Sequence, residues 1–183
     1  IPYNPSDRVE LPKKQKYQGA KAFSPEQLQE ILALFQGDPI EAVVQLAVSY
    51  GMRRSEICGL RWEAVDFAAG TISVCHTAVK NEGEIIFSDH TKTATSRRCL
   101  PLMDSVRSYL LKVHRQQEEY KAMFGKEYVN SGYVCTKPDG TPFDPDFVTH
   151  HFQRVVKAHG LPCRFHDLRH SAVNTLRKGG CDA

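Results

Sequence analysis

Three short segments of this 183-residue sequence carry side chains that could bind or transform a phosphate. The first, GMRRSEICGLRW at residues 51–62, places Arg53 at a predicted corner between two helices. A guanidinium that projects from such a corner can bind a phosphate through two parallel N–H donors. The same arginine could instead cap a helix or lie in solvent, as most arginines do. Glu56, three positions later, is predicted to be structural and to brace the corner.

The second and third segments could add proton transfer and a second phosphate ligand. TKTATSRRCLPL, residues 91–102, is a polar turn leading into a short predicted strand, and its Lys92 could protonate a leaving oxygen. FHDLRHS, residues 165–171, begins a predicted helix in which His166 and Arg169 are three positions apart, so both lie on one face. Taken alone, each segment also fits an ordinary exposed turn lysine or a helix-capping histidine.

The elements that must position these segments are mostly helices. Ser24, Pro25 and Gln27 predict a helix start with a capping box. A second helix is predicted over residues 39–50, with Gly51 as its terminator, and a short third helix over residues 55–60.

Between residues 71 and 102 the pattern changes to β-branched runs separated by a turn at residues 81–83, which predicts one small antiparallel meander of two or three strands. Helical spacing returns over residues 106–124, over residues 147–156 and from His166 onward. The predicted fold class is α+β, mostly helical, with a small antiparallel sheet.

Length and composition predict one globular domain, because 183 residues with 41% hydrophobic residues can form one good core. No apolar run approaches the roughly 20 residues of a membrane span, and the N-terminus has no secretory pattern, so we expect a cytoplasmic protein without a membrane partner. The net charge of +3 permits nucleic-acid binding without indicating it. The cysteines are scattered singly, which argues against a zinc site or a disulfide framework: Cys58, Cys75, Cys99, Cys135, Cys163 and Cys181.

Together and in this order, the three segments resemble the signature regions of the tyrosine recombinases, also called phage integrases. The resemblance runs from Phe23 through nearly the whole remaining chain. Residues 1–22, with their prolines and lysines, resemble the family's linker. The resemblance therefore implies that residues 1–22 join a missing N-terminal core-binding domain to a catalytic domain over residues 23–183.

By this resemblance, Arg53 corresponds to the first catalytic arginine, Lys92 to the sheet lysine, and His166 and Arg169 to the His-x-x-Arg pair. The full-length parent is then expected to recombine double-stranded DNA for a phage or other mobile element, as a tetramer on DNA, through a covalent 3′-phosphotyrosyl intermediate. The two arginines would stabilise the transition state, Lys92 would protonate the 5′-oxygen, and His166 would assist proton transfer from the tyrosine. No metal or other cofactor is expected.

The sequence departs from the family pattern at its end, where a Gly-His region and the nucleophilic tyrosine would follow. All seven tyrosines precede His166: Tyr3, Tyr17, Tyr50, Tyr109, Tyr120, Tyr128 and Tyr133. We therefore expect a fragment that lacks its C-terminal tyrosine segment. This fragment should exist as a monomer, bind DNA and be inactive in cleavage. Two other functions stay open: a strand transferase like the type IB topoisomerases, and a non-catalytic DNA-binding module.

Overall fold

The computed structural model describes residues 23–88 and 97–178 of the chain, with side chains described through residue 174. The predicted linker, the segment that contains Lys92, and residues 179–183 lie outside the described residues. In chain order the elements are α1 (Pro25–Leu34), α2 (Glu41–Tyr50), α3 (Arg54–Cys58), β1 (Val65–Asp66), β2 (Thr71–Val74), β3 (Thr77–Asn81), β4 (Glu84–Ser88), β5 (Arg98–Pro101), α4 (Asp104–Phe124), α5 (Pro145–Ala158) and α6 (Phe165–Lys178). The predicted α+β class is confirmed.

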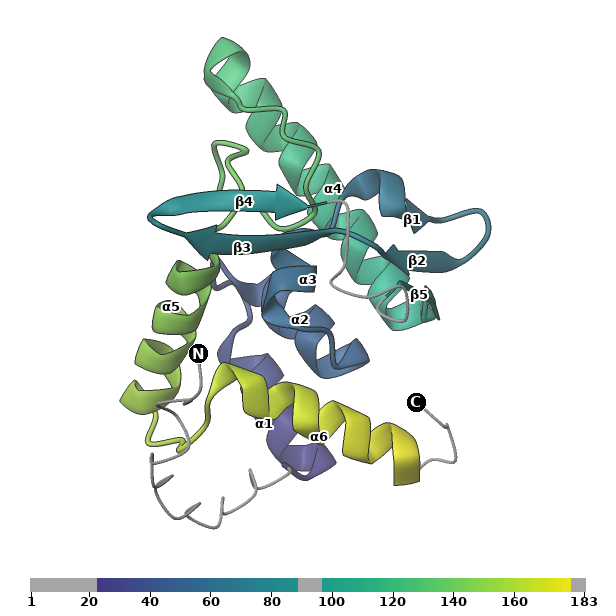
Figure 1. Ribbon diagram of the computed structural model, residues 1–183, viewed down its shortest axis with the longest axis vertical. Coiled ribbons are helices and arrows are strands. Elements are labelled where there is room, and N and C mark those ends of the chain that lie inside the picture. The colour runs from purple at the N-terminus through teal and green to yellow at the C-terminus, as the bar shows by residue number, and fades with distance from the viewer. Residues whose placement is uncertain (1–22, 89–96, 179–183) are drawn as a thin grey trace, which may run out of the picture.

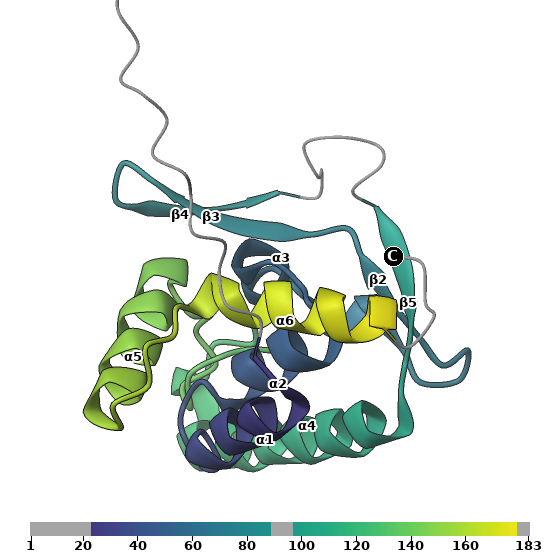
Figure 2. The same cartoon turned by 90° about the horizontal axis from the view of Figure 1, so that it is seen from below.

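Helix α2 forms the centre of the fold, packed against α1, α3, α4 and α6. Its Val43, Val44 and Leu46 side chains are fully buried, and each such burial contributes about 1.5–3 kcal/mol to folding. The β-strands cover one side of this helical core, whereas α4 lies on the opposite side (Figures 1 and 2). Within the part of the chain that the structure describes, no helix is both long and apolar enough to cross a bilayer.

The first helix starts as its capping residues predict. The Ser24 hydroxyl accepts a hydrogen bond from the Gln27 backbone N–H at 3.3 Å, and the Gln27 side chain accepts one from the Ser24 backbone N–H at 2.9 Å. Pro25 occupies the first helical turn, where its missing N–H costs nothing. The predicted helix ends are also close, since α2 ends at Tyr50 and α3 starts one residue before Ser55.

The prediction of a single meander is wrong. Strand β2 pairs antiparallel with β1 and β5, whereas β3 and β4 form a separate two-stranded hairpin around the predicted turn at residues 81–83. The physical reason is that β3 leaves the first sheet to pack on α3. A Cβ on Gly59, at the end of α3, would lie only 2.6 Å from Thr77 Cα, so this close approach requires glycine.

Candidate active site

The corner after α2 lies directly against α6. Gly51 ends α2 in the left-handed region, with φ of 60°, and a Cβ on it would lie 3.3 Å from the Val173 side chain and 3.4 Å from Ala172. The Arg169 guanidinium donates a hydrogen bond to the Gly51 carbonyl oxygen across 118 positions of sequence. Glycine at this corner therefore brings the first and third predicted segments into contact.

At the start of α3, the buried carboxylate of Glu56 binds two arginines. Its Oε2 accepts hydrogen bonds from Arg53 N at 2.8 Å and Arg98 Nη2 at 2.7 Å, and its Oε1 accepts from Arg53 Nη1 at 2.8 Å and Arg98 Nη1 at 3.0 Å. We call these three residues the Glu56 cluster. The prediction that Glu56 braces the corner is confirmed.

The charges of the Glu56 cluster also affect the pKa of Arg169. Burial alone would raise the pKa of Glu56, but the hydrogen bonds from Arg98 and Arg53 outweigh burial and lower that pKa to about 2. Burial lowers the pKa of Arg169, and the nearby positive charge of Arg53 lowers it further, while Glu56 opposes this. Arg53 and Arg169 are thus close enough to repel each other, and the Glu56 carboxylate offsets part of that repulsion.

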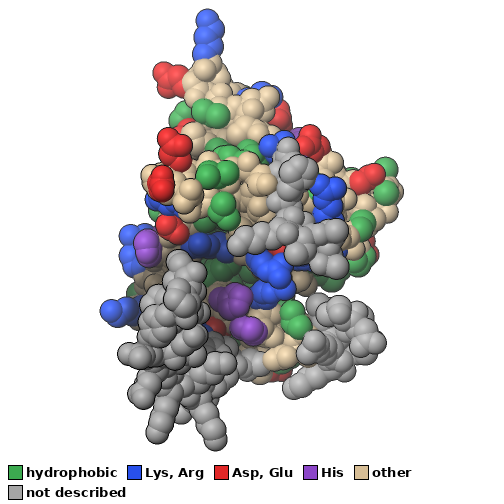
Figure 3. Space-filling view, in the orientation of Figure 1, with side chains coloured by type: hydrophobic (Ala, Val, Ile, Leu, Met, Phe, Trp, Pro, Cys, Tyr) green, Lys and Arg blue, Asp and Glu red, His purple; other side chains and the backbone are tan. Residues whose placement is uncertain are grey.

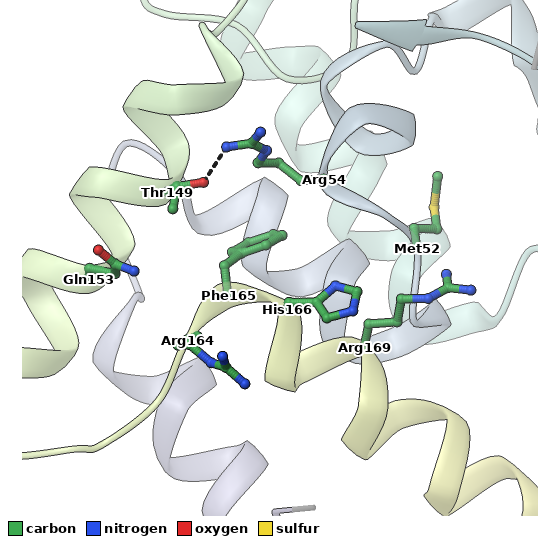
Figure 4. A pocket seen from close by; sticks show the side chains of 8 residues that line it. All are labelled: Met52, Arg54, Thr149, Gln153, Arg164, Phe165, His166 and Arg169. Carbon is green, nitrogen blue, oxygen red and sulfur yellow. Dashed lines mark hydrogen bonds between the residues drawn. The ribbon is translucent and has the colours of Figure 1, made fainter. Parts of the chain in front are cut away.

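Beside this cluster, a cavity of about 350 Å³ lies between α5 and α6. We call it the α5–α6 cavity, and it is lined by Met52, Arg54, Thr149, Gln153, Arg164, Phe165, His166 and Arg169. Figure 4 shows Arg169 and His166 projecting from α6, while Arg54 points toward Thr149 on α5, with Oγ1 of Thr149 2.5 Å from Arg54 Nη1. Lys, Arg and His side chains gather over this part of the surface (Figure 3).

The imidazole of His166 lies at the exposed edge of this cavity. It contacts His170 edge to face, with ring centroids 4.6 Å apart. Burial lowers the pKa of His166, and the positive charges of His170 and Arg169 lower it further. The lowered pKa favours the neutral ring, the state in which an imidazole can accept a proton.

A second arginine–acid pair holds the start of α6. The Asp167 carboxylate accepts hydrogen bonds from Arg164 N at 2.9 Å and Arg164 Nη2 at 2.9 Å. Further along the helix, the Ser171 hydroxyl donates to the Asp167 carbonyl oxygen and accepts from Phe23 N, each at 2.8 Å. These contacts fix the helix turn that carries His166 and Arg169.

The structure brings together three of the four predicted site residues: Arg53, His166 and Arg169 lie around the corner and the α5–α6 cavity. Lys92 lies outside the described residues. Sequence reasoning left out Arg98, although it stands within the second segment and Glu56 needed a cationic partner. It also set aside Arg54, which lines the cavity.

Comparison with protein families matches residues 21–183 to the model described as the phage integrase family. The chain therefore belongs to the phage integrase family of tyrosine recombinases. It is 27% identical over 192 residues to a "Tyrosine recombinase XerC-like" protein of Caldanaerobacter subterraneus, which covers 98% of this chain and 47% of that protein. It is 26% identical over 193 residues to "Tyrosine recombinase XerC 2" of Ralstonia nicotianae, covering 100% of this chain and 49% of that protein.

The chain thus spans about half the length of the curated relatives that it matches. Among solved structures, the Tn1549 transposon integrase in complex with a circular intermediate DNA superposes with a TM-score of 0.76 at 21% identity. The match covers 99% of this chain and 59% of that one. At this level of identity, the likeness supports the fold of an integrase catalytic domain.

Proposed function

We propose that the protein to which this chain belongs breaks and rejoins double-stranded DNA at specific sites, for a phage or other mobile element. Residues 23–183 would form its catalytic domain, and residues 1–22 would link that domain to a core-binding domain. The observation that carries the proposal is that Arg169 and His166 line one cavity, while Arg169 also binds the corner, 118 positions away in sequence, that carries Arg53. The proposal includes four copies assembled on DNA in the cytoplasm.

The arginines suit the charge of the reaction. A phosphodiester is an anion, and nucleophilic attack adds negative charge to its nonbridging oxygens. Fixed cationic donors placed before the reaction stabilise that charge without reorganisation. Arg53 donates Nη1 to Glu56 and keeps 51% of its side chain exposed, so its outer face can reach a phosphate beside Arg169.

Proton transfer would use His166 and Lys92. A neutral His166 can take the proton of an attacking tyrosine hydroxyl, and Lys92 would give a proton to the departing 5′-oxygen. The covalent 3′-phosphotyrosyl intermediate conserves the energy of the broken bond, so joining to a new strand requires no nucleotide.

We propose further that this chain does not supply the attacking hydroxyl. Among the residues that the structure describes, no tyrosine lines the α5–α6 cavity. The Tyr50 hydroxyl donates to Pro101 O at 3.0 Å and accepts from Met103 N at 3.1 Å. Burial raises the pKa of Tyr109 strongly, so its hydroxyl is a poor nucleophile.

DNA binding by this chain tests the phosphate-binding part of the proposal. Fluorescence anisotropy with a duplex should show weak binding that falls steeply with salt, because contacts to phosphates release counterions. Arg53→Ala and Arg169→Ala should each weaken binding roughly tenfold, as expected for a charge-assisted bidentate contact. Arg115→Ala, at an exposed arginine of α4 that does not line the α5–α6 cavity, is the matched control. Binding that is unaffected by either site variant would contradict the proposal.

Covalent chemistry tests the rest. The longer protein that includes a tyrosine after Arg169 should form an SDS-resistant adduct with a nicked substrate, and this 183-residue chain should not. Replacing that tyrosine by phenylalanine should remove the adduct and spare binding. Exchange of strands between two sites, as opposed to relaxation of supercoils alone, would separate a recombinase from a topoisomerase.

A further inference from the structure

Arg98 completes the hydrogen bonding of the Glu56 carboxylate. An ionised carboxylate offers about four acceptor positions. Each Glu56 oxygen accepts one hydrogen bond from Arg53 and one from Arg98, at 2.7–3.0 Å. Because the Glu56 side chain is only 2% exposed, water cannot readily replace the hydrogen bonds from either arginine.

The two arginines of the Glu56 cluster have different exposures. Arg98 donates both terminal nitrogens to Glu56 and keeps 29% of its side chain exposed, whereas Arg53 donates one terminal nitrogen and keeps 51% exposed. The planar fork of Arg98 matches the carboxylate plane, which fixes the carboxylate against rotation. Arg53 is then held by a carboxylate whose orientation Arg98 determines.

We propose that Arg98 is a positioning residue for Arg53: it holds the Glu56 carboxylate in the orientation that directs the Arg53 guanidinium toward the DNA phosphate. This inference rests on the proposed function, since it assigns Arg98 a role in the same reaction. Arg98 acts through Arg53 in this proposal, because both of its terminal nitrogens bind Glu56. It also maintains the negative charge that offsets repulsion between Arg53 and Arg169, since its hydrogen bond contributes most to keeping Glu56 ionised.

The test measures single-turnover formation of the covalent DNA adduct by the full-length protein. Arg98→Met should slow adduct formation by about 10- to 100-fold, the cost of a misplaced reacting group, and should weaken DNA binding by no more than the roughly tenfold expected for Arg53→Ala. Arg98→Lys should retain part of the rate, because an ammonium keeps the charge but cannot bind both carboxylate oxygens in one plane. The matched control, Arg115→Met on α4, should leave the rate unchanged.

A second substrate separates positioning from a purely structural role. A methyl group in place of one nonbridging oxygen removes the negative charge of the scissile phosphate, so Arg53 is needed less on this substrate. The Arg98→Met and Arg53→Ala variants should therefore both recover to within a few fold of the parent protein. If Arg98→Met fails to fold, as thermal unfolding would reveal, Arg98→Lys carries the same comparison.

Two results would overturn the role of Arg98: an equal loss of rate on the charged and neutral substrates, or no loss while Arg53→Ala is impaired. If Arg53→Ala itself cleaves at the parent rate, the failure belongs to the proposed function.

Discussion

Helices α3 and α6 begin with the same local arrangement in different surroundings. In each, an arginine precedes the first helical residue, and an acid three positions later accepts hydrogen bonds from that arginine's backbone N–H and from its guanidinium. The pairs are Arg53 with Glu56 and Arg164 with Asp167. The exposures of the two arginines are similar, at 51% and 57%.

The acids differ. Glu56 is 2% exposed and also binds Arg98, whereas the Asp167 side chain is 10% exposed and its arginine neighbour comes from its own turn. A buried carboxylate is costly unless hydrogen bonds compensate for the lost solvation, and Glu56 has four. The shared arrangement therefore orients an arginine at each helix start, and at α3 the long-range partner Arg98 adds two further hydrogen bonds that hold the acid in place. Four predictions test this difference.

The largest expected effect is the loss in free energy of unfolding when Glu56, in the first turn of α3, is replaced. Glu56→Ala should lower the free energy of unfolding by about 2–3 kcal/mol, because it leaves two arginines without their carboxylate. The value lies below the usual cost of breaking a buried pair, since both arginines can turn toward solvent. Urea unfolding of the 183-residue chain measures it, with Glu63→Ala as the exposed control. A loss no larger than in the control would show that the Glu56 cluster is not stabilising.

The stability of the chain at acid pH should depend on ionisation of the same Glu56 carboxylate. The pKa of Glu56 is about 2 in the folded chain, against an ordinary 4.5. The unfolded chain therefore binds this proton first, so the stabilisation is complete above pH 4.5 and is lost as the pH falls toward 2. Glu56→Gln should flatten this part of a stability-against-pH curve, and an unchanged slope would assign acid sensitivity to other carboxylates.

The third effect is smaller. Asp167→Ala should cost about 1 kcal/mol, the usual value for a helix-capping side chain, because its pairing with an arginine 57% exposed to solvent adds little. Urea unfolding beside Glu56→Ala gives the comparison directly. Equal losses for the two acids would mean that the contact with Arg98 adds no stability.

Local patterns predicted most of the fold, and three of the four residues that they nominated for the site lie near one another in the structure. The capping residues located α1, and Gly51 marked the end of α2, because both depend on neighbours within a few positions. The residue types around Arg53 and His166 match the family's signature regions and so indicated the resemblance. The fold and family are confirmed by the comparisons, whereas the roles of individual site residues stay predictions.

Local patterns could not predict contacts between residues that are distant in the sequence. Arg98 meets Glu56 across 42 positions and Arg54 meets Thr149 across 95, and nothing in the local sequence specifies these pairings. The division of the strands into two sheets has the same cause. It depends on where Gly59 lets β3 approach α3, and β-propensity alone cannot indicate that.

The smallest expected effect concerns the start of α6, where the proposed reaction requires His166 to accept a proton. Burial is the main cause that lowers the pKa of His166. The positive charges of His170, Arg169 and Arg164 add to it, and Asp167 opposes them. A bound phosphate adds negative charge beside the ring and should raise that pKa, so phosphate binding takes up a proton and strengthens as the pH falls toward the lowered pKa of the free ring.

His170→Gln should raise the pKa of His166 in the free chain without restoring its ordinary value, because burial remains. NMR titration of the His166 ring resonances, with and without inorganic phosphate, measures both shifts. His159→Gln at the end of α5 serves as the control, because its ring is bonded to Val155 O on its own helix. If phosphate left the pKa of His166 unchanged while binding elsewhere, the imidazole would lie outside the phosphate site. The difference between the Glu56 cluster and the start of α6 would then have no bearing on phosphate binding.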